Sequence, residues 1–158
     1  LEDGSRGRVC LSVRNQAGIS AEILMSEAEL VFDASPPNIS TITIGSTTAT
    51  PGGSAEWVVV DDAITASWIS EDLHSPLTKT EVAIGVNGGG NKSEILQWTT
   101  LSSPTRRFVD DLAVTSEMTH GESYRFYVRV TNGAGLRAVG VSNPFTVDLT
   151  DPAECDPV

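Results

Sequence analysis

Two histidines are the residues of this chain that would most readily support acid–base catalysis, and neither has a partner in the sequence. His74 and His120 both lie in polar segments without a cysteine or serine nucleophile in a recognisable frame. General-base catalysis needs a second group within hydrogen-bond reach, so we interpret both as loop residues. The run Gly88–Gly90 is followed by neither GK[ST] nor a helix, and is therefore no phosphate loop. We expect no active site, and the protein is not expected to be an enzyme.

Acidic side chains supply the oxygen ligands that calcium prefers, and this chain has several close pairs of them. They are Asp61-Asp62, Glu71-Asp72 and Asp110-Asp111, with Asp148 and Asp151 further along the chain. Because none has the spacing of an EF-hand loop, solvated turns are the preferred interpretation, and calcium is the only cofactor left open. Trp57 and Trp98 offer an aromatic platform for a sugar, although packing against a sheet explains them better.

Two triplets have the form of N-glycosylation acceptors, namely Asn38-Ile-Ser40 and Asn91-Lys-Ser93. Both fall in expected loops, where an acceptor must lie. Between residues 40 and 54, eight serines and threonines stand near a proline, a composition that resembles an O-glycan tract. The candidate acceptors there are Thr47, Thr48 and Thr50, and a solvated polar loop is an equally good interpretation.

The charge balance excludes one class of function. Ten lysines and arginines stand against 21 aspartates and glutamates, which gives a net charge of −11. Non-specific nucleic-acid binding depends on basic side chains, so nucleic acid is not an expected partner. No run of apolar residues is long enough to span a membrane. The chain opens on Leu1 without a signal-like apolar core, and we interpret it as an internal piece of a longer protein.

Short alternating segments recur along the chain, and these elements must position the polar residues. In the segment from Tyr124 to Thr131, Tyr124, Phe126, Val128 and Val130 fall on one face, which is the period of a half-buried strand. Similar segments predict strands over 9–13, 23–32, 39–44, 57–60, 64–68, 80–86, 95–99, 108–114 and 138–147. Short strands separated by turn signals, with no convincing helix, are typical of an antiparallel β-sandwich.

The sequence also contains a degenerate internal repeat. Asn15–Ile19 (NQAGI) matches Asn132–Leu136 (NGAGL) at an offset of 117 residues. Asp33–Pro37 (DASPP) matches Asp148–Pro152 (DLTDP) at an offset of 115 residues. The segment that precedes each turn reads as a strand and the segment that follows as its return. The chain is therefore expected to hold the last hairpin of one module and then one whole further module.

These segments resemble a fibronectin type III-like module. The resemblance covers Ile39 to Pro152, and Val9–Pro37 resembles the final hairpin of an upstream copy. It depends on the inward Trp68, on Met118–Tyr124 (MTHGESY) and on the strand and turn that follow. The resemblance implies a structural corner made by Tyr124, Met118 and Trp68, in which the Tyr124 hydroxyl bonds to the backbone near Met118. Residues 45–57 make the module longer than usual.

From this resemblance we divide the chain into three parts. Residues 1–37 are the C-terminal part of an upstream module, 38–152 are a complete module, and 153–158 are a linker to a following segment. The expected function is that of a structural or adhesive module in a large extracellular or cell-surface glycoprotein, with fibre formation included. Its partners are neighbouring modules of the same or an identical chain, other extracellular proteins, or glycans. The alternatives are an accessory carbohydrate-binding module of a secreted enzyme and a receptor ectodomain segment.

The cysteines and the partial module lead to two further expectations. Cys10 and Cys155 lie at opposite ends of a whole module, beyond the Cα separation of about 4.4–6.8 Å that a disulfide allows, so each should pair outside this chain or stay free. An isolated hairpin is marginal in water. We therefore expect the inward residues Val9, Leu11 and Val13 to need strands from another polypeptide, unless the segment packs on the side of residues 39–152.

Overall fold

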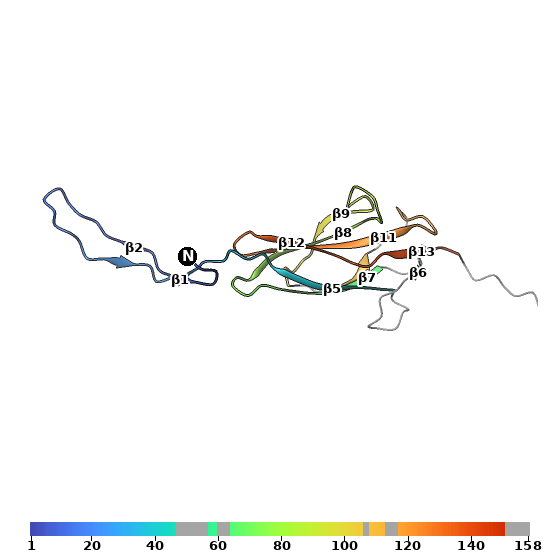
Figure 1. Ribbon diagram of the computed structural model, residues 1–158, viewed down its shortest axis with the longest axis horizontal. Helices are drawn as coiled ribbons and strands as arrows, with labels where there is room; N and C mark the ends of the chain where they lie inside the picture. The colour runs from blue at the N-terminus through green and yellow to red at the C-terminus, as the bar shows by residue number, and fades with distance from the viewer. Residues whose placement is uncertain (47–56, 60–63, 106–107, 113–116, 151–158) are drawn as a thin grey trace, which may run out of the picture.

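The residues that the structure describes form strands and turns with almost no helix. The computed structural model describes residues 1–46, 57–59, 64–105, 108–112 and 117–150 (Figure 1). Within these ranges the strands are β1 (Arg6–Gly7), β2 (Cys10–Leu11), β3 (Leu24–Met25), β4 (Leu30–Val31), β5 (Asn38–Ser46), β6 (Trp57–Val59), β7 (Ile64–Glu71), β8 (Leu77–Val86), β9 (Leu96–Thr100), β10 (Phe108–Leu112), β11 (Ser123–Asn132), β12 (Arg137–Val141) and β13 (Phe145–Asp148). No helix in these ranges has the length and apolar character needed to cross a membrane.

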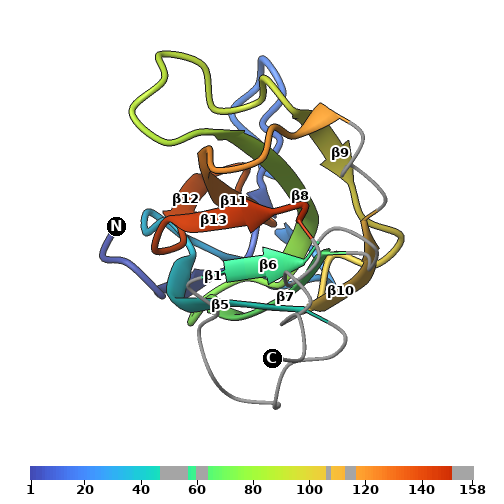
Figure 2. The same cartoon turned by 90° about the vertical axis from the view of Figure 1, so that its right-hand side faces the viewer.

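Strands β5 to β13 form two packed sheets. One sheet has the order β10-β7-β5, and the other has the order β6-β13-β11-β8-β9, with β12 also paired to β11. Every pairing is antiparallel except that of β6 with β13. Viewed along the long axis, β5, β7 and β10 lie below β8, β11 and β13 (Figure 2). This arrangement confirms the predicted all-β antiparallel sandwich.

The core lies between these two sheets and follows the predicted alternation. Tyr124, Phe126, Val128 and Val130 of β11 are all at most 2% exposed. The opposite sheet contributes the inward residues of β5 and β7, which are Ile42, Ile44, Ile64, Ala66 and Trp68. The rings of Trp68 and Phe126 lie 6.2 Å apart between centroids, so this aromatic pair joins the two sheets.

The prediction of one continuous strand over 138–147 is wrong. The strand is divided into β12 and β13 around Ser142–Pro144, because Pro144 has no backbone NH to donate to a ladder. The hydroxyl of Ser142 accepts a hydrogen bond from the backbone NH of Phe126 at 3.0 Å and takes the place of a strand partner there. In the preceding turn, Gly135 has the positive φ (83°) and Gly133 does not.

Residues 1–35, which we call the arm, project along the long axis away from the sandwich (Figure 1). Strand β1 pairs with β4, and β2 pairs with β3, both antiparallel. Two predictions are corrected here. The expected loop over residues 1–8 contains β1, and the expected return strand over 23–32 is interrupted around Ser26, whose hydroxyl accepts from the Val9 NH at 3.0 Å.

The internal repeat is reproduced in the hydrogen bonds of the two turns. Asn132 NH donates to Leu136 O (3.0 Å), Leu136 NH donates to Asn132 Oδ1 (2.8 Å), and Gly135 NH donates to Asn132 O (3.1 Å). The arm has the same three bonds between Asn15, Gly18 and Ile19 at 3.0, 2.9 and 3.0 Å. Gly18 has φ 82°, matching Gly135, and this left-handed conformation is one that glycine adopts without strain.

The repeat extends further toward Leu1 than the sequence indicates. The Gly4 NH donates to Phe32 O and the Phe32 NH to Ser5 O, just as the NH groups of Gly121 and Val147 donate to Val147 O and Glu122 O. Gly7 occupies the place of Tyr124, so the arm has no aromatic corner. The return strand of the arm is also irregular, because three residues lie between Ser20 and Leu24, where two lie between Arg137 and Gly140.

The apolar side chains of the arm are exposed. Val9, Leu11 and Val13, which we expected to point inward, are 55–56% exposed, because no second sheet covers them. Their counterparts on β11 are Phe126, Val128 and Val130, which are fully buried. The alternative in which this segment packs on the side of residues 39–152 is wrong, since the arm meets the sandwich at one end (Figure 1).

Candidate junction site

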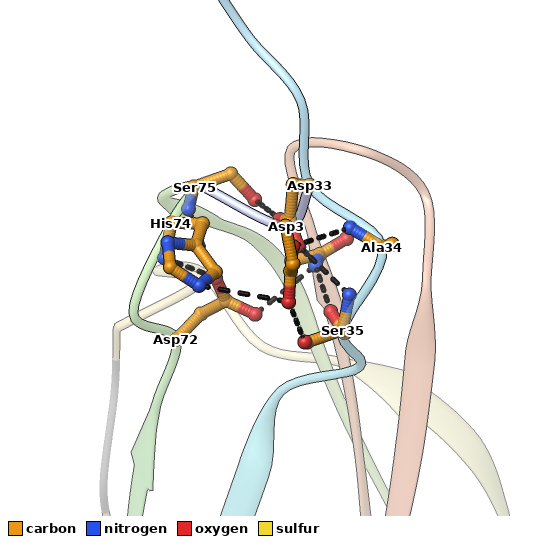
Figure 3. Close-up of polar contacts among 8 residues, drawn as sticks. Asp3, Asp33, Ala34, Ser35, Asp72, His74 and Ser75 are labelled. Carbon is orange, nitrogen blue, oxygen red and sulfur yellow. Dashed lines mark hydrogen bonds and ion pairs between the residues drawn. The ribbon is translucent and has the colours of Figure 1, made fainter. Parts of the chain in front are cut away.

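Where the arm meets the sandwich, polar side chains and backbone groups from four segments converge (Figure 3). We call these residues the junction cluster. It consists of Asp3, Asp33, Ala34, Ser35, Asp72, His74, Ser75 and Asn132. The arm supplies its two ends, the β7–β8 loop supplies residues 72–75, and the end of β11 supplies Asn132. The cluster therefore connects parts of the chain that are far apart in sequence.

Asn132 lies at the centre of the junction cluster and is 1% exposed. Its Nδ2 lies 2.9 Å from Asp33 Oδ2, 3.0 Å from the Ser35 carbonyl oxygen and 3.0 Å from Asp72 Oδ2. Its Oδ1 accepts from the Leu136 NH, which fixes the orientation of the amide. One side chain thus closes its own turn and ties the arm to the β7–β8 loop.

Ser75 makes the second connection. Its hydroxyl donates to Asp33 Oδ2 and accepts from the Gly133 NH at 3.1 Å. The loop is held in shape by Asp72 Oδ1, which accepts from the NH groups of His74 (3.0 Å) and Ser75 (2.9 Å). Asp33 Oδ2 therefore receives a hydroxyl and an amide proton from two elements of the sandwich, both at fixed positions.

Asp3 and His74 form the outer side of the junction cluster. Asp3 Oδ1 accepts from the Ala34 NH at 2.8 Å, and Asp3 Oδ2 accepts from the Ser35 hydroxyl. His74 Nε2 lies 3.6 Å from Asp3 Oδ2. A Cβ at Gly4 would lie 2.6 Å from His74 Cε1, so only glycine permits this close approach of backbone to ring.

Hydrogen bonds lower the pKa of two carboxyl groups of the cluster, those of Asp3 and Asp72. Burial raises the pKa of Asp72, but hydrogen bonds from Ser75, Asn132 and His74 outweigh it and hold that pKa below its usual range. The pKa of Asp3 is lowered chiefly by the hydrogen bond from the Ala34 NH and then by the Ser35 hydroxyl. The carboxylate oxygens of Asp3 and Asp72 are thus matched by hydrogen-bond donors from neighbouring residues of the cluster.

The arrangement of the cluster fits a contact between chain segments better than a cation site. The place among the oxygens of Asp33, Ser35 and Asp72 is filled by the Asn132 amide nitrogen. In the described ranges, no group of three or more histidine, cysteine, aspartate or glutamate residues is placed to hold a metal ion. The side chains of Asp61-Asp62, Asp110-Asp111 and Asp151 lie outside the described residues.

The modification candidates are placed as follows. Asn38, which we expected in a loop, is instead the first residue of β5, where it pairs with Glu71, and it is exposed. Asn91 is exposed in the loop after β8, with its Oδ1 accepting from the Ser93 NH and hydroxyl at 3.1 Å. Cys10 is a free, exposed cysteine on β2. The remaining candidates Thr47, Thr48, Thr50 and Cys155 lie outside the described residues.

His120 and Trp98 are each engaged with a neighbouring residue in the described part of the chain. The Nδ1 of His120 accepts from the Leu149 NH at 3.1 Å, the same bond that Asp3 makes with Ala34 in the arm. The guanidinium carbon of Arg129 lies 4.1 Å above the ring of Trp98, so one face of that ring is occupied. The side chain of Trp57 is outside the described residues.

The corner around Tyr124 has the contact that the resemblance implies. The Thr119 NH donates to the Tyr124 hydroxyl oxygen at 2.7 Å, and Met118 beside it is 6% exposed. Tyr124 itself is 2% exposed and its ring lies 6.1 Å from that of Phe145.

We expect Tyr124→Phe to lower the free energy of unfolding by about 1 kcal/mol, because the Thr119 NH loses its acceptor while the ring stays packed. Urea unfolding at neutral pH measures this difference. Tyr127→Phe is the matched control on the opposite face of the same strand. An unchanged midpoint for Tyr124→Phe would exclude a structural role for the hydroxyl.

The junction residues Asp33, Ser75 and Asn132 were not predicted as a site. An available signal was that the asparagine and the aspartate recur in both copies, Asn15 with Asn132 and Asp33 with Asp148. Comparison with known proteins adds no family to this picture, since no protein-family model and no curated protein matches the chain.

Proposed function

We propose that this chain is a structural or adhesive segment of a large extracellular or cell-surface glycoprotein built from fibronectin type III-like modules in tandem. Its function is mechanical: it sets the spacing of the modules and presents their loops. The observation that carries this proposal is the junction cluster, in which Asp33 of the arm is bonded to Ser75 and Asn132 of the sandwich. Such bonds restrain the direction in which one module leaves the next.

The proposed module division follows from the repeat. The arm repeats the turn and the closing hydrogen bonds of the last strands of the sandwich, and on this basis residues 1–37 are assigned to an upstream module and 38–152 to a complete one. The Tyr124 corner at the start of β11 supports the fibronectin type III-like assignment. Residues 153–158 would then link to a following segment.

Completion of the upstream module is part of the proposal. Ten large apolar side chains of the arm beyond its first residue are at least 40% exposed, and they are Val9, Leu11, Val13, Ile19, Ile23, Leu24, Met25, Leu30, Val31 and Phe32. A patch of this kind on a two-stranded hairpin needs a second layer. Strands equivalent to β5 and β7, which cover the same face of β11 in the sandwich, would cover it, supplied by the same chain or by a neighbour in a fibre.

Asn132→Asp tests the junction. The aspartate keeps the Oδ1 that closes the turn, but it puts a carboxylate oxygen beside Asp33 and Asp72 in place of the amide donor. We expect the arm to lose its fixed direction while the sandwich stays folded. Spin labels on Cys10 and on Thr99→Cys, with Cys155→Ser, report the distance between arm and sandwich by pulsed electron paramagnetic resonance.

The matched control is Asn15→Asp, which makes the same change in the same type of turn at the far tip of the arm. A narrow distance distribution is expected for the parent and for Asn15→Asp, and a broad one for Asn132→Asp. A broad distribution in the parent, or a narrow one in Asn132→Asp, would contradict the proposed restraint.

A further inference from the structure

We propose that Asp148, at the opposite end of the sandwich from the arm, is the attachment point for a following module. In this proposal, Asp148 Oδ2 accepts from an asparagine amide and a serine hydroxyl of that module, as Asp33 Oδ2 accepts from Asn132 and Ser75. The inference rests on the proposed function, because it assumes that modules follow one another in tandem. It adds the residue types by which one module recognises the next.

The local geometry of Asp148 is that of Asp33. Asp33 Oδ1 accepts from the NH of the residue two positions on, Ser35, at 3.1 Å. Asp148 Oδ1 accepts from the NH of Thr150 at 3.0 Å in the same way. Asp148 is the last residue of β13, and Asp33 stands two residues after β4, the strand that closes the corresponding hairpin in the arm. The second oxygen of each carboxylate is therefore presented at the end of the same turn.

The two aspartates differ in what this second oxygen binds. Asp33 Oδ2 is bonded to the hydroxyl of Ser75 and the amide of Asn132. Asp148 Oδ2 accepts no hydrogen bond from any residue that the structure describes, and the side chain is 38% exposed. Its Oδ1 is already occupied by the NH and hydroxyl of Thr150. An ionised carboxylate on a partly exposed side chain, with one oxygen bonded and the other not, can accept a further charge-assisted hydrogen bond.

The contact that Asp33 makes in this structure indicates which donors the partner of Asp148 should supply. Asn132 is presented by a turn whose Oδ1-to-NH bond fixes the amide, and the arm keeps that turn with Asn15 in the same role. The Nδ2 of Asn15 makes no hydrogen bond within the described residues, so the arm carries the amide half of this contact at its free end. Each module thus presents an amide at one end and an aspartate at the other, and the partner of Asp148 is a module with an asparagine in this turn and a serine in its β7–β8 loop.

The spacing along the chain agrees with this assignment. Pro37 stands four residues after Asp33 and is followed by Asn38, the first residue of β5. Pro152 stands four residues after Asp148. A module whose first strand begins directly after Pro152 would therefore have the same length of chain between aspartate and strand as the junction in this structure.

A tandem chain tests the proposal. It consists of residues 1–152 followed directly by a second copy of residues 38–158, with its two cysteines, Cys10 and Cys155, replaced by serine. Thr99→Cys in each sandwich carries a spin label, because Thr99 is exposed on β9 of the structure. We expect one narrow distance distribution between the two labels. Asp148→Asn in the first sandwich keeps the oxygen that Thr150 binds but replaces the other oxygen by an amide nitrogen. Because this nitrogen is a donor and would face the donors of the next module, we expect the narrow distance distribution to be lost.

The controls separate this inference from the proposed function. Asp33→Asn in the same tandem should leave the distribution between the two sandwiches narrow, because it changes only the junction with the arm. A tandem whose distribution is already broad, or one in which Asp148→Asn leaves it narrow, would overturn the assignment of Asp148. In either case the proposed function still stands if Asn132→Asp broadens the distance distribution between arm and sandwich in the 158-residue chain. The proposed function fails if that distribution is already broad in the parent chain.

Discussion

Replacing Trp68 with alanine is expected to lower the free energy of unfolding by about 3–5 kcal/mol. Trp68 is 3% exposed on β7, and its ring packs against Phe126 of the opposite sheet at 6.2 Å between centroids. Removing it opens a cavity between the two sheets at their main aromatic contact. Because the total stability of a domain is about 5–15 kcal/mol, this single change brings the sandwich close to unfolding.

Urea unfolding followed by circular dichroism measures the effect of Trp68→Ala without relying on tryptophan emission. Trp68→Phe is the matched variant. The indole NH of Trp68 has no hydrogen-bond partner among the described residues, so phenylalanine loses volume but no hydrogen bond. We expect it to cost less than half as much as alanine. Trp98→Ala, on the partly exposed β9, controls for the loss of an indole as such. A Trp68→Ala variant as stable as Trp98→Ala would contradict the assigned role.

The second large effect is a loss of stability in acid that depends on Glu81. Glu81 is 5% exposed on β8 and accepts from Arg129 Nε at 2.8 Å and from Lys79 Nζ at 2.7 Å. The hydrogen bond from Arg129 is the main cause that lowers its pKa to about 2, against the opposing effect of burial and with help from Lys79. The folded state therefore favours the ionised form of Glu81 more strongly than the unfolded state does.

A depressed carboxyl pKa stabilises the folded state fully above the unfolded pKa of 4.5, and this stabilisation is lost as the pH falls toward about 2. The difference between the two pKa values corresponds to about 3 kcal/mol. We expect the free energy of unfolding of the parent to fall by this amount between pH 5 and the acid limit, measured by urea unfolding at a series of pH values. The upper end of this window is about 5 because the unfolded carboxyl titrates there.

Glu81→Gln removes this titration and should make the stability curve flatter in acid, at the cost of lower stability at neutral pH. Glu122→Gln, at an exposed position, is the control and should keep the steep dependence of the parent. Parallel curves for the parent and Glu81→Gln would show that other carboxylates cause the acid sensitivity.

The sandwich could be predicted from the sequence because the pattern that identifies each strand lies within a short stretch of chain. The alternation of Tyr124, Phe126 and Val128 and the inward Trp68 each follow from residue type and period, and the structure buries them as predicted. The extension of the repeat toward the first residues of the arm could not be predicted from the sequence. Between residues 2–7 and 119–124, which are equivalent in the two copies, Gly4 and Gly121 are the only identical pair. The hydrogen bonds that repeat there are made by backbone groups, so they do not require the same side chains in both copies.

The junction cluster was beyond sequence reasoning for a different reason. Its bonds connect Asn132 to residues 60 to 99 positions away, and no short motif records such a contact. The exposed residues Val9 and Leu11 show the same limit. Their alternation indicates a face that should be buried, but whether a second sheet covers this face depends on residues distant in sequence. Local pattern predicts the faces of a strand, and packing decides which faces are covered.

The central asparagine of the junction has a chemical vulnerability. Asn132 is followed by Gly133, a small residue whose backbone nitrogen is unhindered for attack on the side-chain amide, the reaction that slowly converts asparagine to aspartate. In the closed junction, both reacting groups are engaged: the Gly133 NH donates to the Ser75 hydroxyl, and the amide is bonded on both of its ends. A junction that opens releases both groups, and the aspartate formed then repels Asp33 and Asp72 on closing. Each opening of the junction would thus carry a risk of becoming permanent, and old molecules would accumulate the open form.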